Sequence, residues 1–126
     1  MRIVICGTRH CPFAYRLINS AWDISPWGPS GSVTTDIIIL YGASGDVDME
    51  APAFARARDY SSVAYPANWD AHGRSAGPIR NRAMAQDGDA VLALWDGKSR
   101  GTLSMITEAT RAGKPVFVYP INGRGE

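Results

Sequence analysis

Glycines and small polar residues follow three separate apolar segments of the 126-residue chain. The three polar segments are Gly7-Thr8-Arg9, Gly42-Ala43-Ser44-Gly45-Asp46 and Asp96-Gly97-Lys98-Ser99-Arg100-Gly101-Thr102. The third has two glycines, two hydroxyls and two cations directly before a predicted helix, where free N–H groups and the helix dipole favour an anion. We therefore expect residues 97–102 to bind phosphate. The alternative is a plain strand-to-helix turn with solvated charges.

Basic residues gather close to this third segment. Between positions 74 and 100 the chain has five of its 13 basic residues, namely Arg74, Arg80, Arg82, Lys98 and Arg100. Arg80 and Arg82 are two positions apart on a predicted helix, so their side chains point about 200° apart. Arg80 is closer to the start of that helix, and we expect it to face the ligand while Arg82 faces solvent.

Carboxylates and one aromatic residue complete the candidate site. Asp46, Asp48 and Asp96 each stand after a predicted strand, where a carboxylate can bind a ribose hydroxyl or act as a general base. Asp48 can instead cap the helix that follows. Trp69 can stack on a base or cover the core, and for His72 nearby a structural role is favoured.

Strands and helices alternate along the chain and must position these residues. Short apolar runs predict strands over residues 2–6, 36–41, 63–65, 90–95 and 115–119. Apolar spacing, prolines and glycines predict helices starting at Pro12, over 48–59, from Pro78 to before Gly88, and over 101–112. Residues 25–32 and 66–77 are predicted as loops, and the length of the second is typical of a functional loop.

This alternation predicts an α/β fold of the Rossmann-like type. Right-handed crossovers between successive strands give a three-layer α/β/α sandwich with a five-stranded parallel sheet. Ligands bind beyond the carboxyl ends of the strands in such sheets, at the point where the strand order reverses. The three polar segments therefore converge on one predicted site.

Composition indicates one folded domain over residues 1–126. Hydrophobic residues make up 45% and charged residues 20%, and the formal net charge is +1, which argues against strong binding of nucleic acid or an anionic membrane. No apolar run reaches the roughly 18 residues of a membrane span, so we expect a cytoplasmic protein.

Cys6 and Cys11 are expected as free thiols. Dinucleotide, Walker and metal-ligand motifs are missing, so neither a cofactor nor a metal is expected.

Residues 67–84 and 96–102 together resemble the YspA/YpsA-related branch of the SLOG superfamily. This superfamily joins the DprA/Smf DNA-processing proteins with the "lonely guy" phosphoribohydrolases, and the resemblance extends over residues 3–118. It implies a Rossmann-like domain that binds a nucleotide or a nucleotide-derived ligand. Arg80-Asn81-Arg82-Ala83-Met84 is similar to the R-K-x-x-M segment of lonely-guy enzymes, so the resemblance gives Arg80 the position of their catalytic arginine.

The second lonely-guy segment, P-G-G-x-G-T-x-x-E, is similar to residues 95–105 but lacks its glutamate here. Ser104 and Met105 stand where that carboxylate belongs. The resemblance therefore implies binding, by which the ligand is sensed or sequestered. In this reading residues 98–102 hold phosphate, Arg80 pairs with it, and Thr8, Arg9 and Trp69 enclose the ribose or base.

Two other functions stay open. The first is a nucleoside-phosphate N-glycosidase or ribosyltransferase, in which Arg80 acts with Asp46 or Asp96 as the substitute carboxylate. The second is a DNA-processing accessory protein like DprA/Smf, against which the small net charge argues. Lonely-guy relatives assemble through a helix face, so the resemblance also implies a homodimer.

Overall fold

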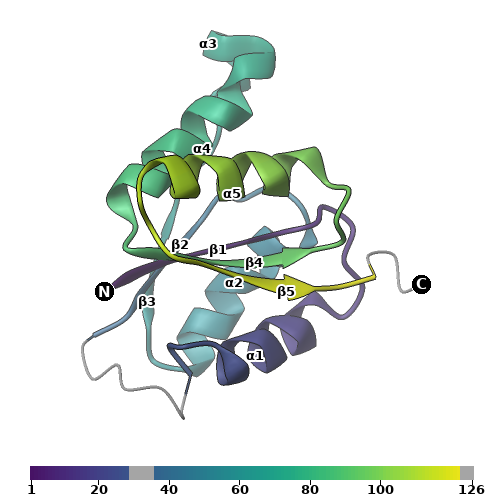
Figure 1. Cartoon of the computed structure of the whole chain (residues 1–126), viewed down its shortest axis with the longest axis vertical. Coiled ribbons are helices and arrows are strands. Elements are labelled where there is room, and N and C mark those ends of the chain that lie inside the picture. The colour runs from purple at the N-terminus through teal and green to yellow at the C-terminus, as the bar shows by residue number, and fades with distance from the viewer. Residues whose placement is uncertain (29–35, 123–126) are drawn as a thin grey trace.

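The computed structural model describes residues 1–28 and 36–122 and shows a three-layer α/β/α sandwich (Figure 1). The strands are β1 (Arg2–Gly7), β2 (Ile38–Tyr41), β3 (Ser61–Ala64), β4 (Ala90–Trp95) and β5 (Val116–Pro120). They form one sheet in the order β3-β2-β1-β4-β5, and each neighbouring pair is parallel. This arrangement confirms the predicted Rossmann-like fold, with the reversal of strand order beside β1.

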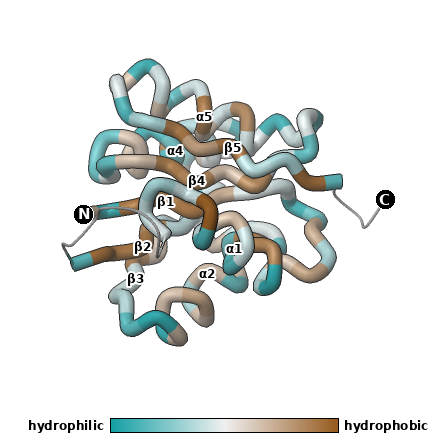
Figure 2. The backbone as a smooth tube through the Cα atoms, turned by 60° about the horizontal axis from the view of Figure 1, so that its bottom comes forward, coloured by the Kyte–Doolittle hydropathy of each residue, from teal (hydrophilic) through white to brown (hydrophobic). Residues whose placement is uncertain are grey.

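Two helices cover each face of the sheet (Figure 1). On one side lie α1 (Ala14–Ile24) and α2 (Asp46–Ala57), and on the other lie α4 (Ala76–Asp87) and α5 (Arg100–Arg111). Figure 2 shows that the most apolar stretches of backbone lie in the strands between these layers. Each helix therefore buries its apolar stripe against a shared central sheet.

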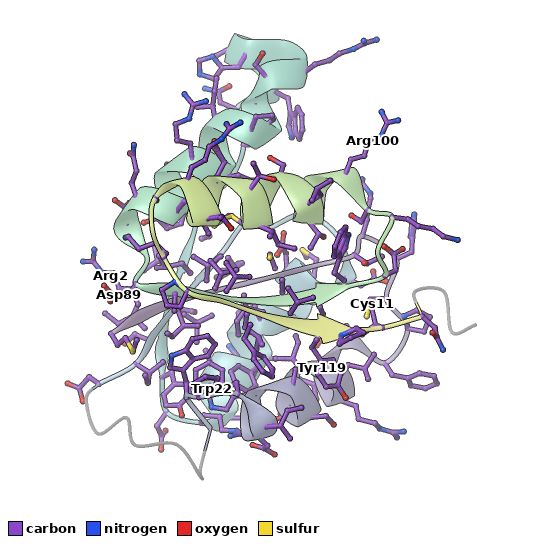
Figure 3. The ribbon with its side chains drawn as sticks, in the orientation of Figure 1. Arg2, Cys11, Trp22, Asp89, Arg100 and Tyr119 are labelled. Atoms are coloured by element: carbon purple, nitrogen blue, oxygen red, sulfur yellow. The ribbon has the colours of Figure 1, made fainter. Side chains whose placement is uncertain are left out.

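An aromatic cluster fills the core beneath α1 and α2. Trp22 is fully buried, and its ring centroid lies 5.2 Å from that of Phe54 and 5.5 Å from that of Tyr60. Figure 3 shows Trp22 on the α1 side of the sheet. The core cluster on the opposite face includes the buried side chains of Met84 and Met105, and Tyr65 packs against it.

The second helix begins earlier than the sequence predicted. Gly45, with a φ of 87°, precedes the first residue of α2, which is Asp46 rather than Asp48. Glycine adopts this backbone conformation without steric cost. As a result Asp48 lies inside the first turn of α2 and not at its N-cap.

The prediction of a loop over residues 66–77 was wrong. This stretch contains the short helix α3 (Trp69–His72), the single 3₁₀ turn η1 (Gly73–Ser75) and the first residues of α4. The side-chain oxygen of Asn68 accepts a hydrogen bond from the backbone N–H of Ala71 at 3.1 Å and caps α3. Figure 1 shows α3 projecting beyond the layered body at the end of α4.

Two further sequence expectations concern a connecting segment and membrane spans. The predicted connection over 25–32 extends into residues 29–35, which lie outside the described residues. Within residues 1–28 and 36–122, no helix is long and apolar enough to span a bilayer.

Candidate functional site

A cavity of about 470 Å³ opens where the carboxyl end of β1 and the loop after β2 meet the first turns of α2, α4 and α5. Ten of the residues predicted for the site line it: Gly7, Arg9, Ser44, Trp69, Arg80, Asn81, Ser99, Arg100, Gly101 and Thr102. The remaining predicted residues lie outside this lining: Thr8, Gly42, Gly45, Asp46, Asp96, Gly97 and Lys98. The structure thus brings Arg80 and the start of α5 to the same cavity.

The first turn of α5 presents unpaired backbone donors to this cavity. Leu103 is the first residue of the helix whose N–H has an acceptor, the Ser99 carbonyl at 3.1 Å. In the described part of the chain, the N–H groups of the three preceding residues, Arg100, Gly101 and Thr102, have no protein acceptor. A Cβ placed on Gly101 meets no atom within 4 Å, so space adjoins these donors. Unpaired N–H groups at a helix start attract an anion.

Asp96 shapes the loop before α5. Its Oδ1 accepts hydrogen bonds from the N–H groups of Ser99 and Lys98, each at 2.8 Å. These bonds, from Ser99 first and Lys98 second, lower the pKa of the Asp96 carboxyl. The Asp96 N–H in turn donates to Oγ1 of Thr8 at 3.0 Å, and the Thr8 residue is buried. The N–H groups of Lys98 and Ser99 are therefore occupied, and the free donors are those of residues 100–102.

Arg80 joins the ends of β2 and β3 at the cavity. Its Nη1 donates to the carbonyl oxygens of Gly42 and of Tyr65, the second at 3.3 Å. Its Nε donates to Oδ1 of Asn81 at 2.8 Å. A Cβ at Gly42 would overlap the guanidinium, so a larger residue there would displace Arg80 from this position. Nη2 has no acceptor among the described residues, which leaves one side of the cation for a ligand.

Asp48 is a cavity residue for which the sequence analysis left two roles open, contact with the ligand and capping of the following helix. It is 7% exposed, and its Oδ2 accepts a hydrogen bond from the N–H of Ser44 at 3.1 Å. Its Oδ1 is buried and has no hydrogen-bond partner among the described residues. Burial raises the pKa of Asp48 to about 6, although the Ser44 hydrogen bond and the charge of Arg80 act in the opposite direction. It lines the cavity from inside the first turn of α2 and is not the N-cap of that helix.

Cys6 lies beside Asp48 in the cavity wall. Burial, and then the charge of Asp48, raise the pKa of its thiol. Cys6 and Cys11 are both free thiols in the structure. Because a thiolate is the reactive form of cysteine, Cys6 contributes a neutral, apolar surface to the cavity at neutral pH.

Gly45 and Asp46 act on the site indirectly, through Arg9. The N–H of Asp46 donates to the carbonyl oxygen of Arg9 at 2.8 Å, and its Oδ2 accepts from the N–H of Cys11 at 2.8 Å. A Cβ on Gly45 would lie 2.9 Å from the Cα of Arg9. These contacts fix the loop after β1 and hold the backbone of Arg9 at the cavity.

The opposite wall comes from α3 and α4. Trp69 is 55% exposed and lies over the start of α4, with its Cη2 atom 3.6 Å from a Cβ placed on Gly77. It is therefore a residue of the cavity mouth rather than a cover for the core. His72 is exposed and outside the cavity lining. Of the two arginines on α4, Arg80 lines the cavity, whereas the side chain of Arg82 is 63% exposed and lies 3.5 Å from Glu108.

Asn81 connects α4 to α5. Its Nδ2 donates to Oγ of Ser104 at 3.2 Å and to the carbonyl oxygen of Gly101 at 3.4 Å. The residue is only 5% exposed, so these hydrogen bonds satisfy a buried amide. Figure 3 shows Arg100 at the adjoining start of α5, with its side chain directed away from the sheet.

Over the described residues, no cluster of three or more His, Cys, Asp or Glu could hold a metal.

Comparison with known proteins identifies the fold. The structure of DNA processing protein A (DprA) from Streptococcus pneumoniae matches 95% of this chain with a TM-score of 0.68 and 17% identity. The chain has a DprA-like fold. It spans 50% of the length of that DprA chain, so the likeness concerns the Rossmann-like architecture and not the whole activity of DprA.

A relative by sequence comes from a bacteriophage. The Gene 61 protein of Mycobacterium phage D29 is 28% identical over an alignment of 131 positions, which covers 94% of this chain and 95% of the phage protein. No model of a known protein family matches the chain.

Proposed function

We propose that the chain binds a small nucleotide or nucleotide-derived ligand in this cavity, and so senses or sequesters it. The observation that carries the proposal is the first turn of α5, where the N–H groups of Arg100, Gly101 and Thr102 are unpaired beside open space. A phosphate group would accept hydrogen bonds from these donors and gain from the helix dipole.

Positive charge around the cavity supports an anionic ligand. Arg9 lines it from the loop after β1, Arg80 from α4 and Arg100 from α5, while Asp48 is the carboxylate among the lining residues. This local excess coexists with a net charge of +1 for the whole chain. Charge of one sign focused in a cleft favours a small anion without giving the protein a general affinity for polyanions.

The exposed indole of Trp69 supports a ligand with an aromatic base. It stands at the mouth, where a planar group can enter without rearrangement of the core. Stacking on an aromatic side chain is favourable for every nucleic-acid base. Phosphate at α5 and a base at α3 together describe a nucleotide.

Two substitutions of Gly101 test this proposal. Gly101→Asp puts a carboxylate beside the three donors, which competes with phosphate, yet an acidic residue in the first turn stabilises the helix. Gly101→Ala keeps the donors free and also stabilises the helix relative to glycine. We expect Gly101→Ala to bind nucleoside 5′-monophosphates like the unaltered protein in titration calorimetry, and Gly101→Asp to bind at least about tenfold more weakly. Equal affinities of the two variants would overturn the proposal, and thermal melts verify that both remain folded.

One observation favours a second candidate, cleavage of an N-glycosidic bond. Asp48 supplies a carboxylate in the cavity, whereas Asp46 and Asp96, predicted for that role, are bound to backbone N–H groups outside its lining. A buried carboxylate can stabilise positive charge that develops on a sugar ring. Incubation with nucleoside 5′-monophosphates, followed by chromatography, tests this candidate, and the absence of free base would exclude it for those substrates.

We further infer membership of the YspA/YpsA-related branch of SLOG, a cytoplasmic location and a homodimer. Exposed apolar side chains on the outer helices, Ile79 of α4 and Leu103 of α5, support association through that face. Sedimentation tests the dimer directly. The small net charge is the reason for proposing no binding of DNA.

A further inference from the structure

One of the two carboxylate oxygens of Asp48 has no hydrogen-bond partner among the described residues. Oδ2 accepts hydrogen bonds from the N–H of Ser44 at 3.1 Å and from its hydroxyl at 3.5 Å, and the backbone N–H of Gly42 also lowers the pKa of the carboxyl, whereas Oδ1 is buried without a hydrogen-bond partner among the described residues. The other buried polar atom of this kind, Nε1 of Trp22, lies in the aromatic core away from the cavity lining. A buried acceptor without a donor lowers stability. Asp48 differs from Trp22 in lining the cavity, where a ligand can supply the missing donor.

The charge beside Asp48 limits which donor can fill this place. Arg80 from α4 acts on the carboxylate as a positive charge, and Cys6 from β1 is held as a neutral thiol. Arg80 thus offsets part of the charge of Asp48 within the protein. A ligand ammonium group would approach Arg80 at an electrostatic cost, and a divalent cation would have only one carboxylate among the lining residues. A neutral donor, such as a hydroxyl group, meets neither obstacle.

The arrangement of the cavity distinguishes a sugar hydroxyl from a base N–H. Trp69 belongs to α3 at the mouth, and the free N–H groups belong to the first turn of α5. Asp48 belongs to neither element and lies on α2, close to β1. With the base at the tryptophan and the phosphate at α5, the sugar is the part of a nucleotide that remains for Asp48.

We propose that Oδ1 of Asp48 accepts a hydrogen bond from a sugar hydroxyl of the ligand, so that the cavity selects ribose-bearing phosphates. This inference rests on the proposed function, because it assumes that a nucleotide occupies the cavity. To that function it adds the residue that binds the sugar and distinguishes ribose from dideoxyribose. A ligand without these hydroxyls leaves the buried Oδ1 without a hydrogen bond. The free-energy cost of that unpaired oxygen, rather than a steric clash, produces the preference for ribose.

Matched ligands test the inference on the unaltered protein. The four nucleoside 5′-monophosphates are compared with their 2′,3′-dideoxy counterparts by titration calorimetry. We expect the dideoxy compounds to bind about 10- to 100-fold more weakly, as for loss of a hydrogen bond to a charged group. If both sets bind equally, the inference is overturned and the proposed function stands. If neither set binds, the proposed function fails as well, so the two failures are distinguishable.

The Asp48→Asn variant connects the selectivity to this residue. It replaces the carboxylate with a neutral amide of the same shape, so the difference between ribose and dideoxyribose ligands should shrink to about threefold or less. Asp59→Asn is the matched control, because Asp59 is exposed and follows the opposite end of α2 with a φ of 60°, which asparagine tolerates. It should keep the full difference. The inference would be overturned if Asp48→Asn kept the full difference in affinity between ribose and dideoxyribose ligands. It would also be overturned if affinity depended on the identity of the base alone, in both the ribose and the dideoxyribose set.

Discussion

Replacement of Asp48 by asparagine should make the free protein more stable at neutral pH. Burial raises the pKa of this carboxyl from 3.8 to about 6, so the folded protein retains a proton that the unfolded chain loses between those values. Stability attributable to Asp48 is therefore complete below about pH 4 and falls as the pH rises to about 6. The asparagine side chain has similar shape and cannot ionise, so it should avoid this loss.

The size of the effect follows from the same pKa difference. The rise from 3.8 to about 6 is about two pH units, and each unit corresponds to about 1.4 kcal/mol, which gives about 3 kcal/mol. This value is an upper limit for Asp48→Asn at pH 7.5, because Arg80 loses its counter-charge in the variant. Arg80 keeps its hydrogen bonds to two backbone carbonyls, which hold the guanidinium in place.

Urea denaturation between pH 4.5 and 7.5 measures this prediction. The free energy of unfolding of the unaltered protein should fall over this range, whereas that of Asp48→Asn should vary much less and be higher at pH 7.5. Asp59→Asn, at an exposed site, should follow the unaltered protein. Parallel pH profiles, or an Asp48→Asn variant less stable than the unaltered protein at pH 7.5, would show that the attraction between Asp48 and Arg80 outweighs the cost of burial.

Two further substitutions separate stability from binding. Arg80→Ala should lower the free energy of unfolding by about 2–4 kcal/mol, because two strand-end carbonyls and Asp48 lose their partner. Urea denaturation measures this loss, and a change below about 0.5 kcal/mol would contradict the joining role of Arg80. Trp69→Ala should leave the melting temperature nearly unchanged, because the side chain is 55% exposed, but should weaken binding of nucleoside monophosphates about tenfold through lost stacking. Unchanged affinity in calorimetry would remove Trp69 from the site.

The sequence was sufficient to predict the fold because its strands are unusually clear. The apolar run at residues 2–6 became β1, whose residues Ile3, Val4 and Ile5 are completely buried. Strand–helix alternation then allowed few topologies. The helix α3 was missed because four residues are too few to show helical periodicity. Its one local signal was Asn68, three residues before the N–H that it caps.

Position along the chain was enough to predict ten of the residues that line the cavity, but it did not predict which residues pair across the chain. Helical spacing placed Arg80 toward the cavity, where it lies. Spacing gave no information on its partners, the carbonyls of Gly42 and Tyr65, which are 38 and 15 residues away. The burial of Asp48 was equally hidden, because it depends on the start of α2 after Gly45 and on packing against β1.

The amide of Asn81 has a mechanical consequence for redesign of this protein. By bonding to Gly101 and Ser104, it links the inner surfaces of α4 and α5. A mutation that tilts either helix to admit a bulkier compound would have to break or stretch these hydrogen bonds. Engineers who want a new specificity would do better to vary the loops after β1 and β2, which form the half of the pocket that Asn81 does not brace.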